Sequence, residues 1–410
     1  MNALPKRWLE ALRVSFGLPS GLAMLAGILL GLSLPAIDDW LGFQLPALAF
    51  DSQSSTRSLL ETIGTATVSV AGLSFSVTIV ALTLASSQLS PRVLRTFRGD
   101  RLSQTTLALF LGTFVYCLTL LVRLGVTNGG REVPDLSVTL AVLLAFSSFL
   151  TFAFFIAHIV NMLEPSTVVD GIYQDGVSLS ENRYPSGPGE PQDCEAARRD
   201  ARSTMGNDQP GEIVSPKSGY LTVVDLGHLV SCLQHGDAFV KQAVPVGTYV
   251  LPGQVLAEVW ARGENREELH GRVLEAFELG KQRTLVQDTA FCVRQLADVA
   301  LKGLSPGIND PTTSENAMDA MASLLVTFIK SETPCEIRVD DEGVPRFLAL
   351  APDLNDLVKL GFDQVVVAAK GSPVVISRLL QLLEHIETQA RANGVRCGET
   401  DRQRRALRRE

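Results

Sequence analysis

The stretch IGTATVSVAGLSFSVTIVALTLAS, residues 63–86, contains no charged side chain and is long enough to cross a lipid bilayer. A hydrocarbon core of about 30 Å requires about 20 apolar residues in a helix. Three other stretches near the N-terminus meet the same requirement, so the sequence predicts an integral membrane protein with four transmembrane helices. The predicted helices cover residues 18–37, 63–86, 105–122 and 136–163.

The first predicted helix also has features of a secretory signal peptide, because Lys6, Arg7 and Arg13 form a basic segment ahead of it. Signal peptides have a shorter apolar region, of about 7–15 residues, followed by a cleavage site of small residues. The apolar stretch 18–37 is longer, and no such site precedes Asp38. The sequence therefore favours a retained membrane anchor over a cleaved signal.

Basic side chains near the predicted helices indicate the orientation of the chain, because Lys and Arg are enriched in cytoplasmic loops. They are frequent before the first helix and after the second, whereas the other two loops carry few arginines beside several acidic residues. The sequence therefore predicts that the N-terminus and the C-terminal domain are cytoplasmic. The loop after the second helix holds Arg92, Arg95, Arg98 and Arg101.

The rest of the chain has the composition of a soluble protein. We expect a cytoplasmic α+β region that contains a small β-sandwich or barrel and a helical bundle. The net charge of −8, without a basic domain, argues against nucleic acid as a partner. The predicted parts are a transmembrane domain at 1–165, a connector with a flexible linker at 166–212, a β-rich domain at 213–262, a helical domain with a hairpin at 263–397 and a basic tail at 398–410.

The β-rich segment resembles half of a biotinyl/lipoyl barrel sandwich, with short β-favouring pieces separated by Gly and Pro, as in Val246-Gly247 and Gly253-Gln254. That family presents a modifiable lysine between two methionines, and no such hairpin occurs here. No biotin, lipoyl group or other cofactor is therefore expected. Beyond it, helices are predicted at 265–279, 288–302, 312–330, 353–369 and 373–393, with a hairpin within 336–350.

One side of the second predicted helix carries hydroxyl and small side chains at three- and four-residue intervals, which forms a continuous stripe. Such residues let membrane helices pack closely, but they also suit a water-lined pathway. No ionisable side chain lies in mid-span, which disfavours a proton-coupled carrier or pump. The pore-lining candidates are Thr62, Thr65, Ser69, Gly72, Ser76, Ile79, Thr83 and Ser86.

The four arginines after this helix are spaced to lie on one side of a continuing helix. They fit cytoplasmic topology and lipid headgroup contact, or alternatively a cationic vestibule at the inner mouth of a pathway. His158, near the inner end of the fourth helix, is interpreted as a satisfied interfacial residue rather than a gate. Small residues also predict close packing, within or between subunits, at Ala23, Gly27, Gly31, Ala108 and Gly112.

The segment Leu304–Thr313 predicts a turn followed by the start of a helix. Asp310 suits the N-cap, and Pro311 suits the first helical position. An alternative is a small-ligand or anion site at the helix N-terminus. The residues of this cytoplasmic turn candidate are Ser305, Pro306, Gly307, Asn309 and Asp310.

Other chemistry is weakly indicated. The six cysteines form no CxxC pair, and those in the predicted cytoplasmic part are expected to be free thiols. Asp225, His228, Cys232 and His235 lack a standard zinc spacing, so no metal site is expected. The sequence has no GxSxG, HExxH, Walker A or GxGxxG motif, and it is not predicted to be an enzyme.

Two long runs of the sequence are distinctive. The first is VAGLSFSVTIVAL at 70–82, continuing as ASSQLSPRVLR at 85–95. The second combines Gln287-Asp288, RQLAD at 294–298 and LSPGINDPT at 304–312. Both runs resemble a family of predicted bacterial inner-membrane proteins catalogued as a domain of unknown function (DUF2254). The resemblance implies a bacterial source and a membrane part followed by a soluble part, and it implies no reaction.

Three hypotheses follow from the sequence. The first is a channel-like homo-oligomer in which the stripe lines a path for an ion or small solute and the cytoplasmic domain assembles and gates it. The second is a non-conducting scaffold or sensor whose cytoplasmic domain binds a partner or ligand. A membrane-bound enzyme has the least support. In each case the lipid bilayer is a partner of the first 165 residues.

Overall fold

The chain divides into two compact units, Met1–Thr167 and Val168–Glu410, which we call the membrane unit and the C-terminal unit. Each unit is described by itself. The computed structural model describes residues 17–41, 53–88, 100–126, 135–180, 189–205, 209–261, 266–331 and 335–408.

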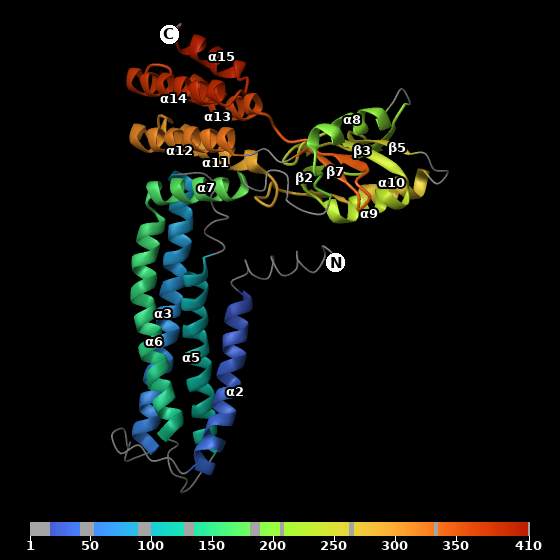
Figure 1. Cartoon of the computed structure of the whole chain (residues 1–410). Helices are drawn as coiled ribbons and strands as arrows, with labels where there is room; N and C mark the ends of the chain where they lie inside the picture. The colour runs from blue at the N-terminus through green and yellow to red at the C-terminus, as the bar shows by residue number, and fades with distance from the viewer. Residues whose placement is uncertain are drawn as a thin grey trace. The chain divides into compact units, whose positions relative to one another are not determined.

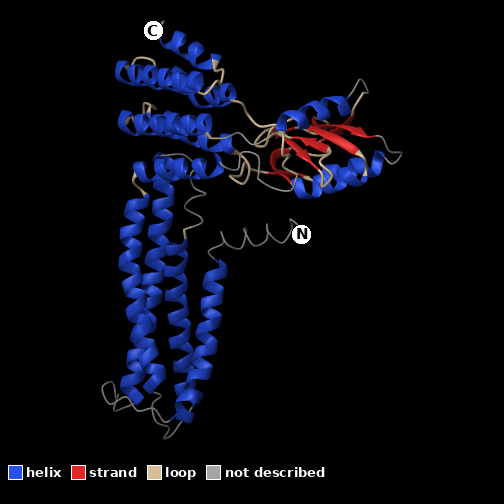
Figure 2. Ribbon diagram, viewed as in Figure 1, coloured by secondary structure: helices blue, strands red, loops and turns tan. Residues whose placement is uncertain are grey.

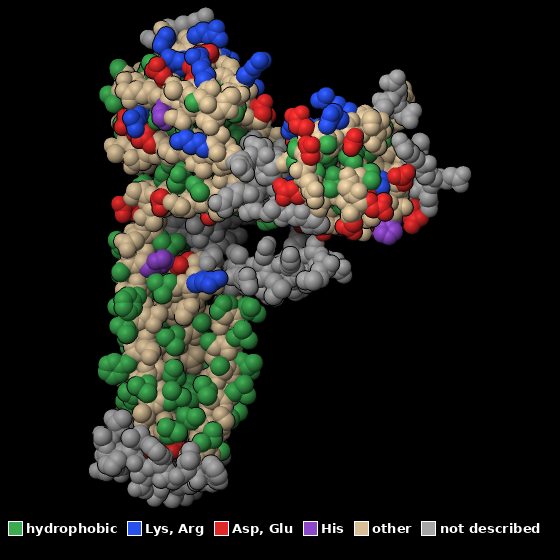
Figure 3. Space-filling model, viewed as in Figure 1, with side chains coloured by type: hydrophobic (Ala, Val, Ile, Leu, Met, Phe, Trp, Pro, Cys, Tyr) green, Lys and Arg blue, Asp and Glu red, His purple; other side chains and the backbone are tan. Residues whose placement is uncertain are grey.

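The membrane unit is a bundle of four long helices (Figure 1). All four are long and apolar enough to cross a membrane, as the sequence predicts. Figure 3 shows hydrophobic side chains spread over their visible face. The helices are α2 (Gly17–Leu41), α3 (Gln53–Gln88), α5 (Arg101–Val126) and α6 (Asp135–Met162).

Glycines allow α2 and α5 to pack closely. A β-carbon built on Gly27 would lie 2.6 Å from the carbonyl oxygen of Gly112, and one built on Gly31 would lie 2.8 Å from Cβ of Thr119. One built on Gly112 would lie 3.1 Å from the carbonyl oxygen of Ala23. These small residues, predicted to mediate close packing, therefore do so within one subunit.

The C-terminal unit contains two sheets (Figure 2). One has five strands in the order β1-β5-β3-β8-β7, and the other has three in the order β4-β2-β6. Among the described residues the strands form no closed barrel, so the predicted barrel is not found. The strands are β1 (Gly211–Val214), β2 (Gly219–Val224), β3 (Ala238–Gln242), β4 (Tyr249–Val250), β5 (Val255–Ala261), β6 (Phe277–Gly280), β7 (Ile337–Val339) and β8 (Pro345–Leu348).

The predicted hairpin forms as the antiparallel pair β7–β8, and it belongs to the five-stranded sheet. Strand β8 pairs in parallel with β3, with Val240 opposite Phe347. Both side chains are fully buried in the main core of this region, together with residues of α9 and α10. Residues far apart in the chain therefore share one sheet and one core.

The remaining helices include all those predicted beyond residue 288, whereas the helix predicted at 265–279 ends at Glu275 and is followed by β6. Three helices lie where the sequence predicts other structure: α8 inside the flexible linker, α9 inside the β-rich segment and α15 in the basic tail. The helices are α7 (Pro165–Ser180), α8 (Cys194–Met205), α9 (Leu226–His235), α10 (Arg266–Glu275), α11 (Thr289–Gly303), α12 (Pro311–Lys330), α13 (Leu354–Ala368), α14 (Pro373–Ala392) and α15 (Gly398–Leu407).

Candidate functional site

The predicted pore-lining stripe lies on an exposed side of α3. Seven of its eight residues are exposed, and Ser86 is half-buried. A β-carbon built on Gly72 would meet nothing within 4 Å, so the space beside the stripe is open within one subunit. No other helix of the described membrane unit covers this face.

The opposite side of α3 carries a second set of small and hydroxyl residues, which the sequence interpretation missed. These side chains are buried and recur with the same spacing, and α3 contacts α5 and α6. The two rows of small and hydroxyl residues on α3 therefore have different environments. One row packs inside the subunit, and the other does not. The buried residues include Thr56, Gly64, Thr67, Ala71, Ser74, Ala81 and Ala85.

Hydroxyl groups of the exposed stripe donate to the backbone of their own helix. The Ser69 hydroxyl donates to the carbonyl oxygen of Thr65 at 2.8 Å, and the Thr83 hydroxyl donates to that of Ile79 at 2.8 Å. The Thr62 hydroxyl donates to the carbonyl oxygen of Ser58 at 2.7 Å. A hydroxyl oxygen keeps lone pairs after donating its hydrogen, so this face offers acceptors to its surroundings.

Large apolar side chains dominate the exposed sides of the other membrane helices. On α6, Phe146, Leu150 and Phe154 are between 62% and 74% exposed, and on α2 Leu22 is 59% exposed. Large apolar side chains of this kind suit contact with lipid. The exposed side of α3 also carries large apolar side chains, such as Phe75 and Val80, and the row of hydroxyl and small side chains lies beside them.

The predicted arginine cluster is only partly described. Arg92, Arg95 and Arg98 lie outside the described residues. Arg101 is exposed and begins α5, whereas α3 ends at Gln88. The prediction that all four arginines extend the second helix is therefore wrong for Arg101, because a new helix starts there.

His158 is paired, as its interpretation as a satisfied interfacial residue requires. Its Nε2 lies 2.9 Å from Oδ1 of Asp100, just before α5. Asp100 also accepts a hydrogen bond from the backbone amide of Ser103 at 2.9 Å. The contact joins the end of α6 to the start of α5.

The turn from Leu304 to Thr313 has the predicted capping structure. Asp310 accepts a hydrogen bond from the Thr313 amide at 3.1 Å, and Pro311 begins α12. The Thr313 hydroxyl and amide hold the pKa of Asp310 below its ordinary value. Because the protein's own carboxylate occupies this helix N-terminus, the geometry disfavours the alternative anion site.

Within this turn, the other candidate residues have structural environments. The Ser305 hydroxyl donates to the carbonyl oxygen of Lys302 at 2.6 Å. Asn309 adopts a positive φ of 49°, a conformation that asparagine tolerates better than most residues. Pro306 and Gly307 are exposed. Each of the five residues therefore has a role in the turn itself or lies at its surface.

The residues considered for zinc lie on and before α9. Asp225 caps the helix by accepting from the His228 amide at 3.1 Å, and His228 Nε2 lies 3.5 Å from Cys232 Sγ. His235 Nδ1 lies 2.7 Å from the carbonyl oxygen of Ser231. Each has a local partner within the helix.

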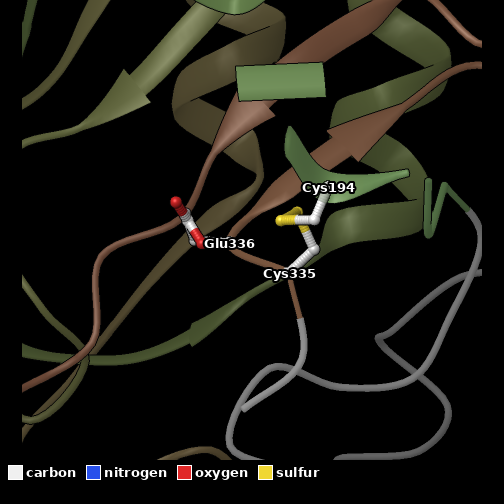
Figure 4. Close-up of side chains that lie close together, drawn as sticks. All are labelled: Cys194, Cys335 and Glu336. Carbon is white, nitrogen blue, oxygen red and sulfur yellow. A yellow bond between two sulfur atoms is a disulfide. The ribbon is translucent and has the colours of Figure 1, made fainter. Parts of the chain in front are cut away.

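Two cysteines depart from the expectation of free thiols. Cys194 and Cys335, 141 residues apart in sequence, form a disulfide. Figure 4 shows this pair beside Glu336. No local signal in the sequence indicates the pairing, because it depends on α8 packing against the strand that follows Cys335.

A small cavity of about 40 Å³ lies in the C-terminal unit between the sheets and the start of α11. Arg338, Gln242 and Asp288 line it, and all three are buried. Arg338 Nη1 donates to the carbonyl oxygen of Cys335 at 2.6 Å. Burial raises the pKa of Asp288, while an ion pair with Arg283 opposes that rise.

Comparison with known proteins agrees with the membrane layout. Over 338 residues, the chain is 29% identical to the uncharacterized proteins Rv1290c of Mycobacterium tuberculosis and Mb1321c of Mycobacterium bovis. The match covers 80% of this chain and 63% of each relative, so the chain spans less than two thirds of their length. No solved structure matches the chain. Residues 13–385 match the pattern of a family described as "Predicted membrane protein (DUF2254)", and the chain belongs to that family.

Proposed function

We propose that the protein is a channel-like homo-oligomer in which the exposed face of α3 lines a path between subunits. One observation carries this proposal: the hydroxyl stripe lies on the side of α3 opposite its buried contacts with α5 and α6. A path inside one subunit would need the stripe to face the bundle interior. Because the stripe faces outward, the path would have to lie between subunits. Several copies of the exposed face, arranged around an axis, would enclose such a path.

The chemistry of the stripe favours water and cations over anions. Ser69 and Thr83 direct their hydrogens to their own backbone, which leaves oxygen lone pairs at the surface. Oxygen dipoles of this kind replace part of the hydration shell of a cation. The stripe has no ionisable side chain, so transport along it would be passive.

Cysteine accessibility tests whether the stripe meets water. Ser69→Cys, Ser76→Cys and Thr83→Cys are introduced separately, and the full-length protein in lipid vesicles is treated with a charged, membrane-impermeant thiol reagent. We expect all three positions to be modified. Ser147→Cys is the matched control, because Ser147 is an exposed hydroxyl on α6 and should face lipid. Peptide mass spectrometry separates these sites from the native cysteines.

Conductance tests the path itself. Purified protein in planar bilayers should pass cation current, and a reversal potential measured across a KCl gradient gives the ion selectivity. Replacing Ser69, Ser76 and Thr83 together by leucine should lower conductance about tenfold or more, because leucine fills the path and removes the oxygens. Ser147→Leu should leave it unchanged. A monomeric particle that passes no current and leaves all three cysteines unmodified would end the proposal.

A second candidate function is a non-conducting sensor with a ligand-binding C-terminal unit. The small cavity favours it, because the fully buried residue Arg338 is one of those that line it, and the space is large enough for one small group such as a carboxylate. Calorimetric titration of the full chain with acetate and with phosphate tests this function. Binding of either anion without any bilayer conductance would support the sensor over the channel.

A further inference from the structure

We infer that Cys194 and Cys335 form a reversible thiol–disulfide site that fastens helix α8 to the five-stranded sheet. Reduction by a dithiol would release the helix. The inference is independent of the proposed conduction, since it concerns only the C-terminal unit. The inference rests on two cysteines that are 141 residues apart in the sequence and whose Cα atoms lie 5.6 Å apart. That separation lies in the range that a disulfide requires.

The disulfide joins α8 to the start of β7. Cys194 is the first residue of α8, and Cys335 lies two residues before the strand begins at Ile337. Glu336, which follows Cys335, accepts two hydrogen bonds from Arg198 of α8, at 2.6 and 2.8 Å. The covalent bond, shown in Figure 4, and this ion pair therefore hold the same end of the helix.

Without the disulfide, α8 is attached by few side chains. Ala197 and Ala201 are its buried residues, Met205 is partly buried, and all three pack on a cluster that includes Phe239 and Ile337. Alanine buries little apolar area, so its contribution to this contact is small. The Arg198–Glu336 pair is partly exposed, with 45% and 24% of the side chains accessible, and exposed pairs contribute little. The covalent bond is therefore the strongest attachment.

The helix does not need the disulfide in order to form. Asp193 precedes α8 and accepts hydrogen bonds from the amides of Glu195 and Ala196, at 2.9 and 3.1 Å. These bonds satisfy the first turn from within the helix segment. The chain before α8 is also held, because the amide of Val339 donates to the carbonyl oxygen of Gly189 at 2.7 Å. Reduction should therefore detach an intact helix and expose the sheet face that it covers.

The exchange reaction balances with a dithiol as the reductant. A thiolate of the dithiol attacks Sγ of Cys194, because Cys194 is half-buried whereas Cys335 is only 8% exposed. The S–S bond breaks, and Cys335 leaves as a thiolate that takes up a proton. The second thiol of the reductant then displaces Cys194. Two electrons and two protons pass to the cysteines, and the reductant becomes a disulfide.

Hydrogen exchange of the full-length chain in detergent tests the inference. Thiols are blocked at lysis, and peptide mass spectrometry determines whether Cys194 and Cys335 are linked. Dithiothreitol should then increase amide exchange in residues 194–205 about tenfold or more, while α12 remains protected. Reoxidation should restore the original protection.

Two variants separate the site from general thiol effects. Cys194→Ser should reproduce the exchange pattern of the reduced protein without dithiothreitol and show no further response to it. Cys397→Ser is the matched control, since Cys397 is also partly buried, and it should retain the full response. Unlinked cysteines after mild oxidation would overturn the inference, as would equal protection of α8 in the oxidised protein and in Cys194→Ser. Stoichiometric Zn²⁺ binding by the two thiols and Glu336, with no disulfide formed on oxidation, would also overturn it in favour of a metal site.

Discussion

The hydroxyl stripe of α3 in the membrane unit and the buried Arg346 of the C-terminal unit find their hydrogen-bond partners in different ways. On α3, the Ser69 and Thr83 hydroxyls donate to carbonyl oxygens four residues earlier in the same helix. In the C-terminal unit, Arg346 joins Asp340 at 2.7 Å and Asp237 at 3.0 Å, and Asp237 lies 109 residues away in sequence. The hydrogen bonds of the α3 hydroxyls are local, whereas the hydrogen bonds of the Arg346 guanidinium join distant parts of the C-terminal unit.

This difference has consequences for function. Lipid offers no hydrogen-bond partner, so a membrane helix must satisfy its polar groups internally or against other protein. Once the hydroxyls of α3 have done so locally, their face remains available for a partner subunit or for solvent. In the C-terminal unit the polar groups are part of the tertiary fold, and changes there should affect stability first.

The largest effect should come from the long-range polar contacts, and Asp340→Ala tests them. The Asp340 side chain is fully buried, and its removal leaves the Arg346 guanidinium with less compensation for its charge. Breaking a buried ion pair of this kind costs about 3–5 kcal/mol. Urea unfolding of the full chain in detergent, followed by circular dichroism, measures the loss.

The neighbouring exposed carboxylate provides the control for that change. Asp341→Ala should alter the free energy of unfolding by no more than about 0.5 kcal/mol, as expected for an exposed position. Similar effects of the two substitutions would mean that the buried pair does not stabilise the C-terminal unit. The buried ion pair of Arg346 would then contribute no more to stability than an exposed side chain does.

A slightly smaller effect is expected for Gly27→Leu in the membrane unit. The new side chain would meet the backbone of α5, where a β-carbon alone would lie 2.6 Å from the carbonyl oxygen of Gly112. Because backbone cannot move aside locally, we expect a loss of about 3 kcal/mol. Resistance of the purified protein to denaturation by SDS measures it. Gly21→Leu, where nothing lies within 4 Å, should be tolerated, and equal sensitivity of the two variants would contradict close packing.

Gly303→Ala should destabilise the C-terminal unit by a smaller amount, about 2 kcal/mol. Its β-carbon would lie 2.3 Å from the Ser314 hydroxyl and 2.8 Å from the carbonyl oxygen of Asp310, at the start of α12. Gly307→Ala, four residues later in the same turn, would meet nothing within 4 Å. Thermal unfolding should distinguish the two variants. A normal midpoint for Gly303→Ala would show that the turn has more space than its geometry indicates.

The sequence predicts local features well for a physical reason. Apolar length is enough to find the membrane helices, and residue type is enough to identify Asp310 and Pro311 as the start of α12. The hydroxyl stripe is also visible from periodicity. Which of the two small faces of α3 is buried could not be predicted, because both have the same spacing and the choice depends on α5 and α6.

Long-range features are harder to predict from one sequence. The pairing of Cys194 with Cys335 requires α8 to form within a stretch whose Pro, Gly, Asp and Arg content favours a linker. The pairing of β3 with β8 requires two strands more than 100 residues apart to meet. Neither contact leaves a periodic or local signal in the sequence, since each depends on the whole C-terminal unit.

The smallest predicted effect concerns a single local charge. Thr313 holds the pKa of Asp310 below its ordinary value, so the ionised carboxylate stabilises the folded state above that ordinary value. The contribution is lost as the pH falls through the lowered pKa. Asp310→Asn keeps a capping oxygen but does not titrate. We expect it to cost about 0.5 kcal/mol near neutral pH, because the site is half-exposed and solvent screens the charge. Urea unfolding at a series of pH values measures the difference in free energy of unfolding between this variant and the unmodified protein, and the difference should vanish in acid. A difference that persists at low pH would mean that the charge of Asp310 contributes nothing to stability. The carboxylate would then act through its hydrogen bond alone.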